Sequence, residues 1–396
     1  MPLTHFEDLS AHGQGFVDDP YPVYARMREH GPVHRVRTAA SGEFWLVVGH
    51  EEARALLTDP RLSNDIRHSA AWQDDGGNSI GLNMVQTDPP QHTRLRGLVA
   101  RNFTTRRIEA LRPRVQQIAD ELVDAMLPSG RADLVEAFAL PLPLAVICEL
   151  LGVPAGDRKA FHDWYLESTD FTRPEVAGAA AQAMTGYLAD LIAAKQLAPG
   201  TDLLSALAGD TGDGEDRLTA EEMLGMAFLL LVAGYETAAN LLSGGTLALL
   251  RHPEQLAALR ADWSLMEKAV EEMLRYEGPV ETTAFRYTKE PVEIGGTLVD
   301  SGESVAVVLA AASRDPGRFA DPDRFDIRRD ARGHMAFGYG IHHCLGAPLA
   351  RMQAAVAFRT LLERCPRLAL DTDPDALVWR PSLMLRGLHH LPVTFG

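Results

Sequence analysis

Cys344 is set among residue types that suit a thiolate approached by a flat ligand. The stretch over residues 334–351 runs HMAFGYGIHHCLGAPLAR, with three glycines around the cysteine and an apolar helical face after it. A sulfur at a helix N-terminus faces unpaired backbone N–H groups and the positive end of the helix dipole, which lower the pKa of a thiol. Such a thiolate is a nucleophile or a metal ligand. The neighbouring His342 and His343 leave both possibilities open, since either histidine could serve as a base.

The stretch as a whole resembles the haem-binding loop of the cytochrome P450 family. The matching residues are Phe337-Gly338-x-Gly340-x-His342-x-Cys344-x-Gly346. The resemblance implies that Cys344 is the axial thiolate ligand of the iron in haem b (iron protoporphyrin IX), with Gly338 and Gly346 beside the cofactor. It also implies that Phe337 packs on the proximal side of the haem and that His342 reaches a propionate.

Two other segments match positions where this family binds the haem propionates. In DPPQHTRLR, a helix that starts after the two prolines places His92 and Arg96 on one face, because they are four residues apart. Arg286, in ETTAFRYT, matches a further propionate-binding arginine. Buried carboxylates need cations, and arginine binds them with two hydrogen bonds. The predicted propionate set is His92, Arg96, Arg286 and His342.

A third match is structural and concerns VEEMLRYEGPV. Glu272 and Arg275 are three residues apart, so they share a helix face and can pair. Most pairs of this kind are solvated and weak. The resemblance to the ExxR motif of the family, with Arg324 about fifty residues later in DPDRF, instead predicts a buried Glu–Arg–Arg network. Buried charges require such mutual pairing.

The segment LLLVAGYETAANLL places two polar residues, Glu236 and Thr237, in an otherwise apolar helix. One interpretation is a local kink, in which Thr237 bonds back to a carbonyl and Gly234 permits the distortion. The resemblance to the AGxET segment of the family implies a groove at Ala233 that holds dioxygen above the iron. In that interpretation Thr237 donates a hydrogen bond to the oxygen unit and Glu236 relays protons to it. We expect both interpretations to hold.

A run of arginines follows in ARNFTTRRIEALRPR. It is either a solvated helix face or a local basic patch on an acidic protein. Members of the family accept electrons on the cysteine side of the haem, so the resemblance implies docking of an acidic ferredoxin or flavodoxin-type donor, served by its reductase. The arginines concerned are Arg101, Arg106, Arg107, Arg112 and Arg114.

Helical periodicity dominates the elements that must position these residues. Apolar residues at three–four spacing predict a mainly α structure, a helical body with a small β portion, and the resemblance implies that it is a single cytochrome P450 domain over residues 1–396. The strand signals are short: Phe44 to Val48, a pair around the Gly295–Gly296 turn, and Glu303 to Val308. The predicted helices are Ile108 to Leu127, Leu140 to Leu151, Val176 to Lys195, Ala220 to Arg251, Ser264 to Tyr276 and Ala347 to Glu363.

Composition excludes several other classes of protein. A formal net charge of -16 argues against a nucleic-acid partner. The three cysteines, Cys148, Cys344 and Cys365, are widely spaced, which argues against a disulfide framework or a cysteine zinc site and favours a reducing compartment. The first residues, MPLTHFEDLSAHGQ, lack the pattern of a signal peptide, and the longest apolar run, Met223 to Tyr235, is shorter than a membrane span. We expect a cytoplasmic monomer that does not insert into membranes.

The resemblance implies a haem-thiolate monooxygenase that uses O2 and electrons from NAD(P)H, delivered by separate partner proteins. The sequences of the segments ICELLGVP, AGYETAANLLSGG and LRGLHHLPVTFG are most similar to those of soluble bacterial members of the family. Among these members, they most resemble enzymes that hydroxylate or epoxidise macrolide and other polyketide skeletons. A steroid or terpenoid hydroxylase is the alternative within the family, and a haem-thiolate sensor without oxygen chemistry is the alternative of another class. The expected contacts to a large apolar substrate are Val85, Phe171, Leu229, Ala233, Val280, Thr283 and Leu385.

Overall fold

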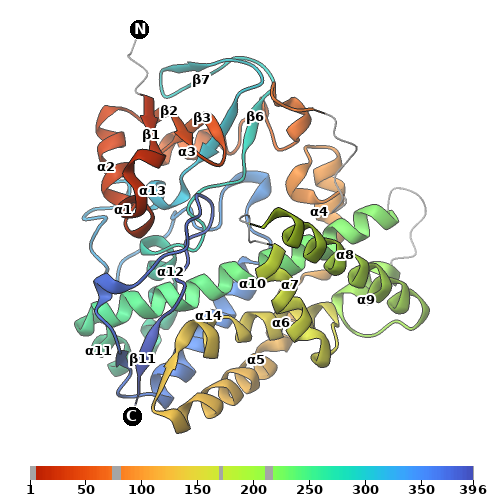
Figure 1. The fold of residues 1–396 in the computed structure, drawn as a ribbon, viewed down its shortest axis with the longest axis vertical. Helices are drawn as coiled ribbons and strands as arrows, with labels where there is room; N and C mark the ends of the chain where they lie inside the picture. Colours follow the sequence, from red (N-terminus) through yellow and green to blue (C-terminus); the bar gives the residue numbers. More distant parts are fainter. Residues whose placement is uncertain (1–5, 74–81, 169–172, 210–216, 396) are drawn as a thin grey trace.

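The structure is a computed structural model that describes residues 6–73, 82–168, 173–209 and 217–395. Helices form most of the fold, and strands gather mainly at one end of it (Figure 1). The helices are α1 (Gly13–Asp18), α2 (Tyr21–His30), α3 (His50–Leu56), α4 (Gln91–Asn102), α5 (Thr105–Met126), α6 (Pro141–Leu151), α7 (Arg158–Ser168), α8 (Pro174–Leu197), α9 (Leu203–Gly209), α10 (Ala220–Arg251), α11 (Pro253–Ala261), α12 (Met266–Tyr276), α13 (Leu309–Ser313) and α14 (Ala347–Arg364). The strands are β1 (Phe6–Asp8), β2 (Val33–Thr38), β3 (Gly42–Val47), β4 (Leu62–Ser63), β5 (Arg131–Asp133), β6 (Arg286–Thr288), β7 (Val292–Ile294), β8 (Thr297–Val299), β9 (Ser304–Val307), β10 (Ala369–Leu370) and β11 (Pro392–Thr394).

Helix α10 is the central element of the helical body and crosses the view of Figure 1. A capping box starts it: Thr219 accepts from the backbone N–H of Glu222, whose side chain accepts from the backbone N–H of Thr219. Its long apolar sequence is buried because other helices contact it on several sides, among them α6, α8, α12 and α14. Helix α14, which follows Cys344, packs in turn on α5. The core therefore contains α10 and α14, the two helices that must flank any ligand of Cys344.

The largest sheet has the strand order β1-β2-β3-β9-β6-β4. Its centre is formed by β3 and β9, which run parallel with Trp45 opposite Val305. Strand β6 pairs with β9 in the antiparallel direction, so that Arg286 lies opposite Val305. The remaining strands form a β10-β11-β5 sheet and a β7-β8 hairpin. This arrangement matters for function because β6 carries Arg286 from the sheet toward the helical body.

The predicted helices are all present, and their bounds differ by a few residues at most. The long central helix, Ala220–Arg251, has the predicted bounds. The predicted strand and hairpin segments correspond to β3, β7, β8 and β9. Several strands were not predicted, including β2, β5, β6 and β11. Strands β5, β6 and β11 have three residues each and pair with distant parts of the chain, so they leave little periodic signal. Strand β2 pairs with the neighbouring β3 and was missed despite that local partner.

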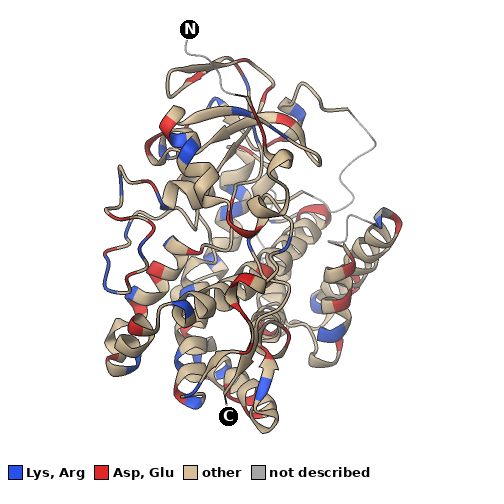
Figure 2. Cartoon of the chain, turned by 60° about the vertical axis from the view of Figure 1, so that its left-hand side comes forward, with Lys and Arg blue, Asp and Glu red and all other residues tan. Residues whose placement is uncertain are grey.

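Acidic and basic residues lie mainly along the outer helices and loops (Figure 2). Helix α10 carries few of them. By length and composition it is apolar enough to cross a membrane, as no other described helix is, and 61% of its most apolar stretch is buried inside the protein. That burial is typical of a core helix.

Candidate active site

A cavity of about 350 Å³ lies between α10 and the loop that carries Cys344. The α10 wall is made by residues between Leu229 and Leu241, and the facing wall by residues from Ala336 to Gly346. The segment from Pro279 to Ala284 closes another side. Most of the side chains that line the cavity are apolar, as is usual for sites that bind small molecules.

The loop before α14 turns so that the side chain of Cys344 faces this cavity. Gly338 and Gly340 have φ values of +69° and +76°, in the left-handed region that disfavours other residues. At Gly340 a Cβ atom would also lie 2.6 Å from the carbonyl oxygen of Leu57. The backbone N–H of Cys344 donates to the carbonyl of Phe337 at 2.9 Å, which closes the loop. The backbone of the loop and its contact with Leu57 therefore require glycine at position 340, whereas the predicted role of the glycines in leaving room for a ligand stays a prediction.

The predicted lowering of the Cys344 pKa is wrong. Burial raises the pKa of the Cys344 thiol above its ordinary value. The backbone N–H of Gly346, the guanidinium of Arg96 and the backbone N–H of Ala347 act in the opposite direction without cancelling the effect of burial. Because a bound metal cation deprotonates a coordinating thiol, this environment suits a metal ligand better than a free thiolate nucleophile.

The predicted propionate set forms one cluster at the edge of the cavity. The rings of His92 and His342 lie with their centroids 4.2 Å apart. Arg96, Arg286 and His342 line the cavity, and Arg96 Nη2 donates to the carbonyl of His343 at 2.7 Å. Buried nitrogens of three residues have no hydrogen-bond partner among the described residues: both ring nitrogens of His92, Nε2 of His342 and Nε of Arg286.

The cluster brings cationic and imidazole side chains together in a buried setting, which disfavours their charged forms. Burial, and to a smaller extent the nearby Arg286, His92 and Arg96, together lower the pKa of His342 to about 3. Burial likewise lowers the pKa of Arg286 to about 10, and Asp88 offsets only part of that effect. Buried, unpaired donors of this kind are costly and require an acceptor. Two carboxylates of a ligand, such as the propionates of a haem, would satisfy them.

Two neighbouring residues of α10 lie in different surroundings. Thr237 lines the cavity, and its Oγ1 donates to the carbonyl of Ala233 at 2.8 Å, which is the predicted back-bond. Glu236 is 7% exposed and is not among the cavity-lining residues. Its carboxylate accepts from Arg380 Nη1 at 3.3 Å. Burial raises the pKa of Glu236 despite the opposing effect of Arg380, so its carboxyl group holds a proton more readily than an exposed glutamate does.

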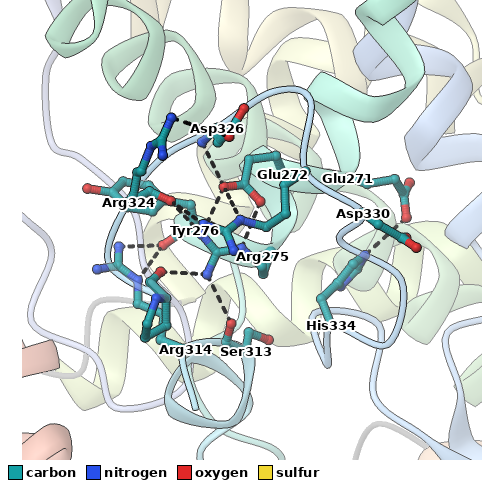
Figure 3. Close-up of polar contacts among 12 residues, drawn as sticks. Glu271, Glu272, Arg275, Tyr276, Ser313, Arg314, Arg324, Asp326, Asp330 and His334 are labelled. Carbon is teal, nitrogen blue, oxygen red and sulfur yellow. Dashed lines mark hydrogen bonds and ion pairs between the residues drawn. The ribbon is translucent and has the colours of Figure 1, made fainter. Parts of the chain in front are cut away.

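The buried pair that joins Glu272 and Arg275 is present (Figure 3). Both side chains are fully buried, and Arg275 donates from Nε and Nη2 to the two carboxylate oxygens at 2.7 and 2.9 Å. The remaining donors of Arg275 reach backbone carbonyls of the segment that leads to the cysteine loop. These are the carbonyls of Ser313 at 3.2 Å, Pro322 at 2.7 Å and Arg324 at 3.2 Å.

The third member of this network is Arg329, and the prediction of Arg324 was wrong. The Arg324 side chain is 65% exposed and pairs with Asp326 at 3.6 Å. A turn in which the N–H of Arg324 donates to the carbonyl of Asp321 directs the Arg324 carbonyl to Arg275, while its side chain points outward. Arg329 Nε instead donates to Glu272 at 3.3 Å, as does the backbone N–H of Asp326 at 2.9 Å.

Five of the seven predicted substrate contacts line the cavity: Val85, Leu229, Ala233, Val280 and Thr283. Leu385 does not. It pairs with Val280 through an antiparallel bridge, and Val280 lines the cavity in its place. Phe171 lies outside the described residues. The sequence prediction missed lining residues that the helical spacing of α10 could have identified, since Leu230, Gly234 and Leu241 follow the same face as the predicted Thr237. It also missed Leu349, Ala350 and Gln353 of α14.

The Cys344 thiol and the side chains of Arg96, Arg286 and His342 line one cavity, and α10 contributes Thr237 to its wall. These are groups that a haem-binding protein needs. Comparisons with known proteins agree. The family model described as cytochrome P450 matches residues 190–385. Cytochrome P450 monooxygenase PikC of Streptomyces venezuelae is 58% identical over 98% of this chain and 93% of its own length. The 6-deoxyerythronolide B hydroxylase of Saccharopolyspora erythraea is 46% identical over 99% of each chain.

A solved structure shows the same fold. The cytochrome P450 PksS of the Bacillus subtilis 168 bacillaene polyketide synthase superposes with a TM-score of 0.91, at 38% identity over 97% of this chain and 99% of that one. The chain belongs to the cytochrome P450 family. It is a haem-dependent monooxygenase, of a family whose members take electrons from redox partners and bind apolar substrates.

Proposed function

We propose that this monooxygenase inserts one oxygen atom from O2 into a large, neutral macrolide or other polyketide, by hydroxylation or epoxidation. The observation that carries the proposal is a single apolar cavity lined by both Cys344 and Thr237. Among the described residues, the charged side chains that line this cavity are Arg96 and Arg286, both in the proposed propionate set, so no charge is left over for an ionic substrate. The names of PksS, a cytochrome P450 of polyketide biosynthesis, and of the 6-deoxyerythronolide B hydroxylase support the same substrate class by analogy.

The cofactor in this proposal is haem b. Cys344 would hold the iron, His92, Arg96, Arg286 and His342 the two propionates, and Phe337, Gly338 and Gly346 the cysteine face. Ala233 would line the opposite face, on α10. When bound, the haem supplies the activation of dioxygen. The orphaned nitrogens of the propionate set support this assignment.

A binding screen tests the substrate class. Macrolides, steroids and terpenoids are titrated against the ferric protein, and binding is followed by the change in the haem absorption spectrum. We expect macrolides to give the tightest binding and an oxygenated product on turnover with surrogate redox partners. Tight binding confined to steroids or terpenoids would replace the proposed substrate class. NAD(P)H consumption without any oxygenated product would instead favour the alternative function, a haem-thiolate sensor without oxygen chemistry.

The proton in this reaction is handled by α10. Thr237 Oγ1 lies on the cavity wall and can pass a proton to the oxygen substrate, and Glu236, one residue away, can replenish it. The raised pKa of Glu236 supports its assignment as a proton donor. For the relay to run, the Glu236 carboxyl group must release Arg380.

The Thr237→Ala variant is expected to uncouple the enzyme. Without the hydroxyl, proton delivery slows, and we expect product per NAD(P)H consumed to fall about tenfold while hydrogen peroxide rises. Both quantities are measured with the best binder from the screen. Thr246→Ala is the matched control, since Thr246 makes the same back-bond to Leu242 at 2.7 Å on the same helix but lies outside the cavity lining. Equal coupling in the two variants would remove Thr237 from the relay.

The arginine run of α5 divides into two parts. Arg112 pairs with Glu109, and Arg114 with Glu149, so their charges are largely offset. Arg106 is exposed and Arg107 half-buried, both in the first turn of the helix that packs on α14. We propose that Arg106 and Arg107 attract an acidic ferredoxin or flavodoxin-type donor, which its reductase supplies with electrons.

The Arg106→Glu/Arg107→Glu variant is expected to be reduced at least tenfold more slowly by a ferredoxin at low salt. The difference should shrink as salt is added, because screening weakens the steering of charged partners. Stopped-flow reduction under carbon monoxide measures the rate. Arg26→Glu/Arg37→Glu, at the β-rich end, changes the net charge equally and is expected to have little effect. Unchanged rates in the α5 variant would rule out this docking site.

The same proposal places the protein in the cytoplasm as a monomer, with residues 1–396 as a single domain. Its long core helix α10 is packed against other helices, which supports a protein that does not insert into membranes.

A further inference from the structure

Glu271 lies beside Glu272 on α12 but serves a different set of partners. Its carboxylate accepts two hydrogen bonds from Arg351, from Nε at 2.6 Å and from Nη2 at 2.9 Å. It also accepts from His334 Nε2 at 3.1 Å. In Figure 3, Glu271 and His334 lie to one side of the Glu272–Arg275 network, and no dashed line joins the two groups of residues. Glu271 therefore forms a second cluster, which no step of the proposed reaction uses.

The two partners of Glu271 stand on either side of Cys344 in the sequence. His334 precedes the cysteine by ten residues, and Arg351 follows it by seven, in the second turn of α14. One carboxylate thus joins the start of the cysteine loop to the helix that follows it. A loop of this length has considerable freedom unless its ends are fixed. The contacts of Glu271 supply that fixation from a third element, α12.

The same cluster surrounds the ring of Phe337. The guanidinium of Arg351 lies over this ring, 4.4 Å from its centroid. The rings of His334 and His343 lie 5.9 and 6.2 Å from it. Because Arg351 is held by two parallel hydrogen bonds to Glu271, its planar group has a fixed orientation. The position of Phe337 at the cavity wall therefore depends on Glu271 through Arg351.

The charges in the cluster balance. Burial would raise the pKa of Glu271, but hydrogen bonds from Arg351 and His334 outweigh it and hold the pKa at about 2. His334 Nδ1 accepts from the backbone N–H of Ala336 at 3.2 Å, which leaves Nε2 to donate to Glu271. Glu271 and Arg351 thus form a neutral pair. The positive end of that pair lies beside the cysteine loop, because the Arg351 guanidinium stands over Phe337, whose carbonyl accepts from the backbone N–H of Cys344 at 2.9 Å.

We infer that Glu271 is a positioning residue for the cysteine loop: it fixes His334 and Arg351, and it neutralises the charge that Arg351 would otherwise exert on the cysteine ligand. This inference rests on the proposed role of Cys344 as the iron ligand. Glu271 touches no substrate. It acts through Arg351 on Phe337 and on the sulfur, so its effect is expected in the properties of the haem iron and not only in stability.

The test compares Glu271→Gln with Glu267→Gln, an exposed glutamate of the same helix. The reduction potential of the haem iron and the carbon monoxide adduct of the reduced protein are measured in both purified holoproteins. In Glu271→Gln we expect a more positive potential, because the uncompensated guanidinium favours the added electron. At a fixed applied potential, the ratio of reduced to oxidised protein should rise at least twofold. The red-shifted band of sulfur ligation should also be lost severalfold faster on warming. Glu267→Gln should match the native protein in both measurements.

A second pair of variants separates the charge of Arg351 from simple destabilisation. Removing both charges in Glu271→Gln/Arg351→Gln should bring the potential back toward the native value, whereas Arg351→Gln alone should lower it. A lower melting temperature in Glu271→Gln without any change of potential would overturn the inference, as would equal shifts in the single and double variants. If the native protein itself lacks the red-shifted band, the proposed role of Cys344 as the iron ligand is wrong, and the inference about Glu271 is not the cause.

Discussion

The Cys344→Ser variant is expected to fold and to lose monooxygenase activity below detection. Serine has nearly the same size, and the position faces a cavity, so little packing is lost. A neutral hydroxyl is a poor ligand for haem iron, and it cannot donate the electron density by which a thiolate favours cleavage of the O–O bond. Product formation with the best binder from the screen, together with the haem content of the purified protein, measures the effect.

Cys365→Ala is the matched control for this prediction. Cys365 is a buried thiol at the other end of α14 and is not among the residues that line the cavity. Its variant should keep the activity and the absorption spectrum of the native protein, at some cost in stability from the lost packing. A Cys344→Ser protein that still formed product at a rate near that of the Cys365→Ala protein would exclude Cys344 as the ligand.

The Arg275→Leu variant is expected to lose about 3–5 kcal/mol of the free energy of unfolding. Removal of the guanidinium leaves the fully buried carboxylate of Glu272 without its main partner, and it leaves the carbonyls of Ser313 and Pro322 without a donor. An unpaired buried charge is among the few features that make one substitution this costly. Urea titration, followed by circular dichroism and by haem absorption, measures the loss.

Arg324→Leu is the control, because only its backbone carbonyl takes part in the network and its side chain is exposed. We expect it to change the free energy of unfolding by no more than about 0.5 kcal/mol. Arg329→Leu should fall between the two variants, since Arg329 makes one contact of 3.3 Å with Glu272. Equal losses for Arg324→Leu and Arg275→Leu would contradict the network seen in the structure.

This network shows how far the sequence could predict the site. Glu272 and Arg275 were predictable because three-residue spacing on a helix places both side chains on one face. The second arginine was not, since Arg324 and Arg329 lie in the same irregular segment, and no periodicity there tells which side chain points inward. The choice depends on a backbone turn at Asp321, which sequence spacing does not reveal.

The electrostatic surroundings were harder to predict than the positions. His92, Arg96, Arg286 and His342 do meet beside the cavity. The Cys344 pKa was predicted with the wrong sign, because the helix N-terminus is visible in the sequence whereas the desolvation of the sulfur by the surrounding chain is not. Likewise, the motif that holds Glu236 gave no sign of its partner Arg380, which lies far away in the sequence.

The secondary structure was likewise predictable where local sequence specifies it and not where distant contacts do. Helices such as α10 and α14 were predicted because a local repeat of apolar residues specifies them. Strand β6, which carries Arg286, was missed because its three residues acquire their conformation from β9 and β4, at a distance along the chain. Val280 and Leu385 were both assigned to the cavity, but only Val280 lines it, since the bridge that pairs Leu385 with Val280 is a tertiary feature.

The absorption spectrum of the reduced, carbon monoxide-treated native protein tests the central claim most directly. If Cys344 anchors a haem iron through its sulfur, protein purified after expression with ample haem precursor should show the red-shifted band that thiolate ligation produces. A colourless protein, or a haem protein whose adduct absorbs at the unshifted position of nitrogen ligation, would contradict the account of this site.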